Sequence, residues 1–88
     1  MFSIEKIYKK NPLTSWQKLD QQILIISEDN QFAHELNEIA AYAWERFDTK
    51  TISEIATELV EEYEVESSTL LSDLESLVMD LQNKNLVL

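Results

Sequence analysis

The hydrophobic pattern of the chain changes its period once, at Leu36-Asn37, and this change limits the possible folds more than any other feature. Before it, residues 15–19, 22–27 and 31–36 show the short alternating or continuous β-branched runs that are typical of strands. After it, apolar residues recur three and four positions apart, which is the spacing of amphipathic helices. Strands followed by helices, without alternation, predict an α+β fold in which a three-stranded antiparallel sheet is followed by three helices.

The helical part of the chain carries recognisable start signals. Asn37 is a suitable N-cap for the first helix. Residues 51–54 fit a capping box for the second helix, because a threonine is followed three residues later by a glutamate. The third helix is expected to begin at Ser67 or Ser68 and to run to about Asn83. Its main apolar stripe consists of Leu70, Leu74, Leu77 and Leu81.

The chain contains no glycine, although hairpins and helix ends often use glycine where the backbone becomes left-handed. Asparagine can take that conformation because its short polar side chain forms local hydrogen bonds. We therefore expect Asn30, Asn83 and Asn85 to occupy left-handed positions.

Charge is distributed unevenly along the 88 residues, whose formal net charge is −10. Residues 1–18 carry four lysines against one glutamate, a net +3, whereas residues 19–88 carry three basic against sixteen acidic residues, a net −13. An acidic body repels a phosphate backbone, because affinity for nucleic acid comes mostly from lysine and arginine. We predict one domain over residues 15–88 that does not bind nucleic acid, preceded by a flexible N-terminal arm over residues 1–14.

Residue types that carry catalysis are scarce in this sequence. With no cysteine, no glycine and one histidine, the chain lacks thiol chemistry, Cys/His zinc sites and glycine-rich phosphate loops. His34 has apolar neighbours in a predicted strand and is interpreted as a structural residue. The glutamates of residues 61–66 lack the spacing of a calcium loop and are interpreted as a solvated surface. We therefore predict no catalytic activity, no metal and no cofactor.

The sequence predicts neither a membrane span nor an export signal. The longest apolar run, residues 23–26, is far shorter than the ~20 residues that a membrane span requires. Residues 1–12 contain lysines but not the apolar segment and small-residue cleavage site of a secretory signal. Together with the absence of cysteine, these observations favour a cytoplasmic protein without membrane contact.

The last helix has more apolar residues than one core stripe needs. At 100° per residue, Leu71 and Val78 lie roughly 80° from the centre of the leucine stripe and form a second flank. This flank either broadens the buried face or lines a groove, and the pattern favours neither interpretation. An apolar groove beside a free strand edge is the arrangement that captures an extended peptide by strand addition.

The same order of elements is compatible with a winged helix-turn-helix, which raises the alternative of a DNA-binding regulator. The charged residues of the candidate recognition helix are Asp73, Glu75, Asp80 and Lys84. A helix that reads the major groove is expected to carry Arg, Lys, Asn or Gln near its start, and this helix does not. A further alternative is a structural adaptor or dimerisation module, so we expect a monomer or a weak dimer through the sheet edge.

The region from residue 36 onward, LNEIAAYAWERFDTKTISEIATELVEEYEVESSTLLSDLESLVMDLQNKNLVL, resembles the PqqD-like proteins, also called precursor-peptide recognition elements. Their pattern comprises a strand, Leu-Asn, a helix with a large aromatic residue, a turn, T-x-x-E-I, an acidic helix and a leucine-rich helix. The matching residues are Leu36-Asn37, Trp44, Asp48, Thr51, Glu54-Ile55, Leu59, Tyr63, Val65, Asp73, Leu74, Leu77 and Leu81. The match covers about residues 15–88 and departs at Thr49 and Asn85, where glycine is usual.

The resemblance implies a compact winged-helix-like domain, without catalytic activity, that binds the leader segment of a ribosomally made precursor peptide. It also implies delivery of that peptide to a modifying enzyme, either a radical SAM protein or a leader protease with a cyclase. The leader would add as a strand to residues 31–36, in a cleft beside the last helix. The implied peptide-binding residues are Gln31, Phe32, Ala33, His34, Glu35, Leu71, Asp73, Leu74, Glu75 and Val78.

Overall fold

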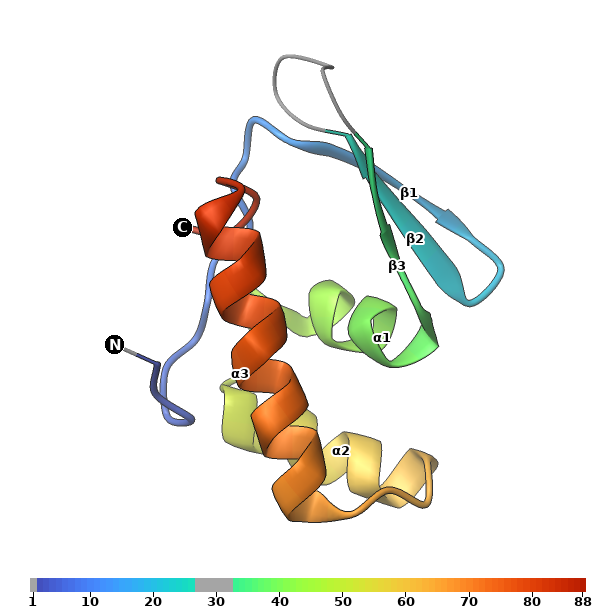
Figure 1. Cartoon of the computed structure of the whole chain (residues 1–88), viewed down its shortest axis with the longest axis vertical. Coiled ribbons are helices and arrows are strands. Elements are labelled where there is room, and N and C mark those ends of the chain that lie inside the picture. Colours follow the sequence, from blue (N-terminus) through green and yellow to red (C-terminus); the bar gives the residue numbers. More distant parts are fainter. Residues whose placement is uncertain (1, 27–32) are drawn as a thin grey trace.

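The computed structural model describes residues 2–26 and 33–88, and it contains three strands followed by three helices (Figure 1). These elements are β1 Ser15–Leu19, β2 Gln22–Ile26, β3 Ala33–Leu36, α1 Glu38–Arg46, α2 Ile52–Glu62 and α3 Ser67–Asn83. The predicted α+β fold, with an open antiparallel sheet ahead of the helices, is confirmed. No helix within the described ranges has the length and apolar character that crossing a membrane requires.

The three strands form one antiparallel sheet in the order β1-β2-β3. The central strand, β2, places Ile25 opposite Trp16 of β1 and opposite His34 of β3. Because side chains alternate along a strand, Ile23 and Ile25 share one face of the sheet, and both are fully buried in the core. The outer edges of β1 and β3 carry no further strand among the described residues.

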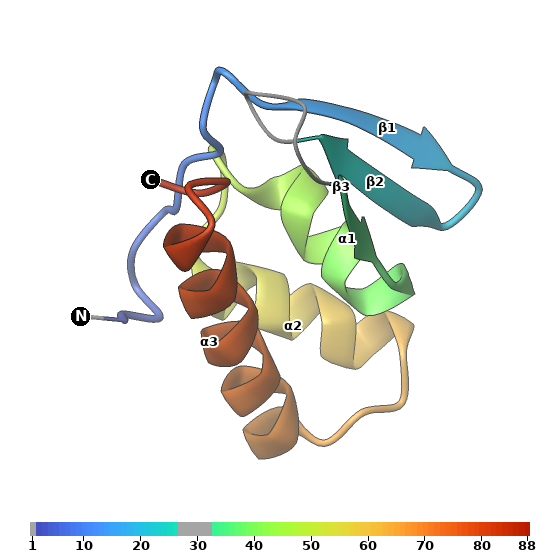
Figure 2. The same cartoon turned by 45° about the horizontal axis from the view of Figure 1, so that its top comes forward.

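Helix α1 lies at the centre of the fold and contacts β2, β3, α2 and α3 (Figure 2). Its predicted N-cap is confirmed, because the backbone N–H of Ala40 donates to the side chain of Asn37 at 2.9 Å. The predicted capping box of α2 is also confirmed. The N–H of Glu54 donates to Thr51 Oγ1 at 3.1 Å, and the N–H of Thr51 donates to Glu54 Oε1 at 2.9 Å.

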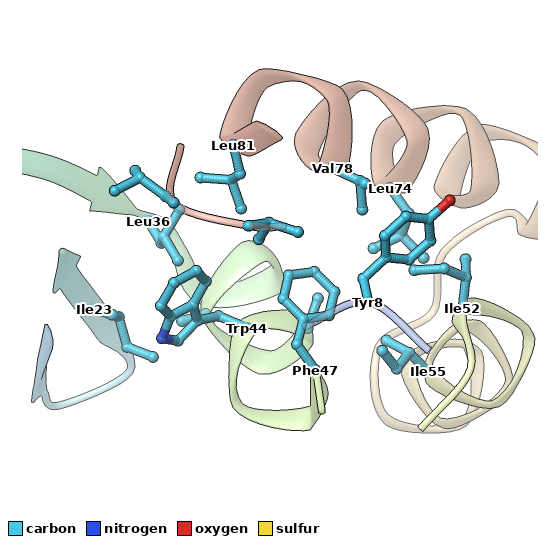
Figure 3. Close-up of a cluster of buried hydrophobic side chains, with 14 of the residues drawn as sticks. Tyr8, Ile23, Leu36, Trp44, Phe47, Ile52, Ile55, Leu74, Val78 and Leu81 are labelled. Carbon is cyan, nitrogen blue, oxygen red and sulfur yellow. The ribbon is translucent and has the colours of Figure 1, made fainter. Parts of the chain in front are cut away.

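The core is centred on Trp44 of α1 and on Phe47, the residue that follows this helix, and α3 covers both (Figure 3). Trp44 is fully buried and meets Trp16 and Phe47 edge-to-face, with ring centroids 6.2 Å apart in both pairs. The buried residues of α3 are Leu70, Leu74, Val78 and Leu81. Leu77, which was predicted in the same stripe, is only half-buried. The stripe predicted for α3 is therefore turned slightly, so that Val78 enters the core and Leu77 lies at its margin.

Residues 2–14 lie against the helices, which differs from the predicted flexible arm (Figure 1). Tyr8 is 1% exposed and belongs to the core. Two isolated β-bridges join the segment to the rest of the fold, Ile7 to Thr51 and Lys10 to Val87. The segment thus docks through one fully buried side chain, two single bridges and further scattered backbone hydrogen bonds, and such contacts leave no periodic pattern in the sequence.

Residues with side chains hold the left-handed backbone positions of this glycine-free chain. Within the described residues these are Asp20, Asp48 and Asn85, with φ of 58°, 83° and 59°. The prediction for Asn85 is confirmed, whereas the prediction for Asn83 is wrong because that residue ends α3. Asn30 lies outside the described residues. Asp48 is held in place by Lys10, whose backbone N–H donates to its Oδ1 at 2.9 Å and whose ammonium lies 3.2 Å from its Oδ2.

Candidate functional site

Strand β3 is a short edge strand, paired on its inner side with β2. Such a strand presents backbone N–H and C=O groups to any extended chain that can lie beside it. Ala33 and Glu35 are exposed, while the other two residues of β3 are turned toward the helices, as the predicted alternation requires. The predicted site residues Gln31 and Phe32 lie outside the described residues.

An apolar hollow of about 530 Å³ lies between the start of α1 and one side of α3. Asn37, which directly follows the last residue of β3, is part of its wall, so the hollow begins where the strand ends. The α3 residues that line it recur three and four positions apart and therefore share one side of the helix. Its apolar surface comes from Ile39, Ala40, Val65, Leu70, Leu74 and Leu77, and its charged residues are Asp73 and Asp80.

A polar bridge joins β3 to the C-terminal end of α3. The ammonium of Lys84 lies 3.1 Å from Nδ1 of His34 and 3.0 Å from Oδ2 of Asp80. Nε2 of His34 lies 3.7 Å from the same oxygen of Asp80. No Cα atom of β3 lies within 8 Å of a Cα atom of α3, so side chains make this connection.

The environment of His34 keeps its imidazole neutral at neutral pH. Burial lowers the pKa of His34 below its ordinary value of 6.5, the charge of Lys84 lowers it further, and Asp80 opposes the shift. An ammonium can only donate hydrogen bonds, so Nδ1 of the neutral ring accepts from Lys84. This geometry agrees with the predicted structural role of the histidine.

The predicted site residues of α3 separate onto different sides of the helix. Asp73 and Leu74 line the hollow that begins at the end of β3. Leu71 instead lines a second hollow of about 290 Å³, together with Ile4 of the N-terminal segment and residues of α2. Glu75 is exposed and lines neither of these two hollows.

Val78 is fully buried and belongs to the core. Contrary to the prediction, Leu71 and Val78 therefore do not form one exposed flank of a groove. Leu71 is turned toward α2 and Val78 toward the interior. For Val78, the alternative interpretation of a broad buried face holds. Leu77 and Asp80 also line the hollow, which the sequence did not predict. The leucine pattern assigned Leu77 to the core, and it gave no role to Asp80.

A second polar cluster joins α1 to α2, and none of its residues lines the hollow beside β3. Glu58 is paired with Lys50 and accepts hydrogen bonds from the hydroxyl of Tyr42 at 2.9 Å and from Nε of Arg46 at 3.1 Å. The hydrogen bond from Lys50, followed by those from Tyr42 and Arg46, lowers the pKa of Glu58 to about 2. This cluster fastens two helices. The described part of the chain contains no group of three or more His, Asp and Glu residues that could hold a metal ion.

Residues 22–87 match the model of a protein family described as coenzyme PQQ synthesis protein D (PqqD). Two solved structures share the fold, each with a TM-score of 0.82. One, TbiB1 in complex with the TbiA(beta) leader peptide, is 21% identical, and the match covers 90% of this chain and 93% of that chain. The other, lasso peptide synthetase B1 complexed with the leader peptide, is 24% identical, and the match covers 94% of this chain and 99% of that chain. No curated protein matches the sequence.

Proposed function

Because the chain belongs to the PqqD family, we propose that it is a peptide chaperone that binds the leader segment of a ribosomally made precursor peptide. The bound leader brings the precursor to a modifying enzyme, either a radical SAM protein or a leader protease acting with a cyclase. Both similar solved structures are complexes with a leader peptide, which supports the first part of the proposal. Precursor peptides are made in the cytoplasm, and we place the protein there.

The observation that carries the proposal is the continuity between the free edge of β3 and the apolar hollow. Asn37 is the residue that follows β3, and it forms part of the wall of the hollow. A peptide paired with Ala33–Leu36 therefore reaches the hollow with its next residues. Main-chain hydrogen bonds to the edge supply affinity, and the hollow accepts side chains that alternate toward it. A volume of about 530 Å³ is ample for an aliphatic or aromatic side chain.

The proposal assigns different tasks to the two parts of the site. Backbone groups of β3, from Ala33 to Glu35, pair with the leader, and the antiparallel sheet favours an antiparallel fourth strand. Leu74 and Leu77 form the apolar floor of the hollow. Further contacts from Gln31, Phe32 and Glu75 remain predictions from the family resemblance.

Fluorescence anisotropy with labelled peptides encoded beside this gene tests the proposal. We expect saturable binding by one such peptide in the micromolar range, which corresponds to about 8 kcal/mol. A scrambled peptide of the same composition is the control, since it keeps any general attraction to a protein of net charge −10. Equal binding by the scrambled peptide, or binding weaker than about 1 mM (~4 kcal/mol) by every peptide, would contradict the proposal.

The free edge of β3 also favours a competing use, pairing with a second copy of the chain. Sedimentation velocity over a range of concentrations separates a monomer from a weak dimer. If the dimer uses the edge of β3, a bound leader peptide returns the protein to monomers. A dimer that persists with saturating leader would place self-association on another surface.

A further inference from the structure

The two carboxylates of the hollow differ in whether a partner already holds them. Asp80 is bonded to Lys84 at 3.0 Å and lies 3.7 Å from His34. Among the described residues, Asp73 takes part in none of the salt bridges. Asp73 is also exposed, so its carboxylate is open to a cation from outside the chain. Of the described residues that line the hollow, none is basic.

The position of Asp73 relative to β3 fits the path of an extended peptide. Asp80 lies beside β3, because the polar bridge ties it to His34. Asp73 is seven residues earlier on the same side of α3, about 10 Å along the helix axis at 1.5 Å per residue. An extended peptide rises about 3.3 Å per residue, so roughly three residues cover the same distance. The carboxylate of Asp73 therefore faces a peptide residue about three positions beyond the peptide residue that lies beside Asp80.

The surroundings of Asp73 suit a long basic side chain better than a small cation. Leu70 and Leu77 are one turn away on the same side of α3 and belong to the apolar surface of the hollow. The aliphatic stem of a lysine or arginine can lie on such a surface while its charged end reaches a carboxylate. An acidic peptide side chain at this place would meet a like charge, which adds discrimination against the wrong peptide.

We infer that the leader carries a lysine or arginine that pairs with Asp73, about three residues from an apolar residue that fills the hollow. This inference rests on the proposed function and narrows its substrate class to extended peptides with an apolar anchor beside a cation. Asp73 then acts as a specificity-determining residue. An exposed ion pair of this kind changes affinity by only about 1.5- to 5-fold, so its signature is the choice among peptides.

Selection from a display library of random 15-residue peptides tests the inference. The baits are the wild-type protein, Asp73→Lys and Glu61→Lys. The last variant is a matched control, because Glu61 is an exposed acidic residue that lines the second hollow with Leu71 and does not line the hollow beside β3. Both variants change the net charge equally, and circular dichroism establishes that both keep the wild-type helix content.

We expect peptides selected on the wild type and on Glu61→Lys to share an apolar residue with Lys or Arg about three positions away. On Asp73→Lys that basic preference should disappear, and Asp or Glu should replace it. Two results would overturn the inference and leave the proposed function standing. In the first, the wild type selects apolar peptides without a preference for Lys or Arg. In the second, both variants lose that preference equally. Failure of the wild type to select any peptide would count against both.

Discussion

The two sides of α3 that flank its buried stripe look alike in the sequence but differ in what lies beside them. The strand side, which contains Asp73 and Leu77, borders the hollow of about 530 Å³ that continues from the free edge of β3. The arm side, which contains Leu71, borders a hollow of about 290 Å³ against α2 and the docked N-terminal segment. Both sides offer apolar surface, but among the described residues a free strand edge adjoins the strand side and not the arm side. The apolar residues of a helix side are therefore not sufficient to make it a candidate peptide site, because a neighbouring element must also supply a free strand edge.

Replacement of Val78 by aspartate should have the largest effect, because Val78 belongs to the buried stripe between the two sides and is fully buried. The new carboxylate would have no partner in the core, and its cost is comparable to the whole ~5–15 kcal/mol stability of a small domain. We expect the variant to be unfolded by circular dichroism. Met79→Asp is the control, since Met79 is 51% exposed and should keep the fold. A folded Val78→Asp variant would show that this part of α3 is not core.

Truncation of Tyr8 tests whether the N-terminal segment is a structural part of the arm side. Tyr8→Ala removes a side chain that is 1% exposed and should lower the free energy of unfolding by about 3–5 kcal/mol, measured with urea. Tyr8→Phe removes only the hydroxyl, which accepts from the N–H of Ser3 at 2.9 Å, and should cost about 1 kcal/mol. Unchanged stability in Tyr8→Ala would mean that residues 2–14 do not dock in solution.

A charge placed on each side in turn separates their functions directly. Leu77→Asp puts a carboxylate into the strand-side hollow and should weaken leader binding at least tenfold, about 1.4 kcal/mol. Leu71→Asp makes the same change at another half-buried leucine, on the arm side, and should leave the affinity within about twofold. Anisotropy titrations measure both, and circular dichroism monitors the fold. The reverse order of effects would place the peptide on the arm side.

A smaller effect is expected from the titration of His34, which belongs to the bridge on the strand side. The pKa of His34 is lowered in the folded protein, so the unfolded chain binds a proton more readily. The stabilising contribution is therefore complete above the ordinary pKa of 6.5 and is lost as the pH falls from there through the folded-state pKa.

Urea unfolding of the wild type and of His34→Gln at pH 7.5 and pH 5.5 measures this contribution. The stability of the wild type relative to the variant should decrease at the lower pH, because other titrating groups cancel in the comparison. An equal difference at both pH values would mean that His34 titrates alike in the folded and unfolded chain.

Local chemistry made much of the fold predictable from the sequence. The caps at Asn37 and Thr51 depend on hydrogen bonds within three residues, so the local sequence identifies them. The alternation along β3 follows from backbone geometry and is observed in Ala33–Leu36. The left-handed position of Asn85 follows equally from a short-range requirement.

The parts that sequence reasoning missed depend on contacts between distant segments. Tyr8 reaches the core from a segment without periodicity, and Asp48 takes its left-handed position with Lys10 as a partner 38 residues away. The candidate site was predicted only in part, because a modest turn of α3 about its axis exchanged the roles of Leu77 and Val78. Packing against α1 and the sheet decides that turn, and a helical pattern read alone does not contain it.

Amide hydrogen exchange of the protein, with and without a saturating leader peptide, tests the central claim most directly. If the leader adds as a strand to the free edge of β3, the outward-facing amides among Ala33–Leu36 should exchange more slowly in the complex, since new main-chain hydrogen bonds protect them. Amides beside Leu71 on the arm side should be unchanged. Saturable binding that leaves exchange in β3 unaltered would contradict strand addition as the mode of recognition.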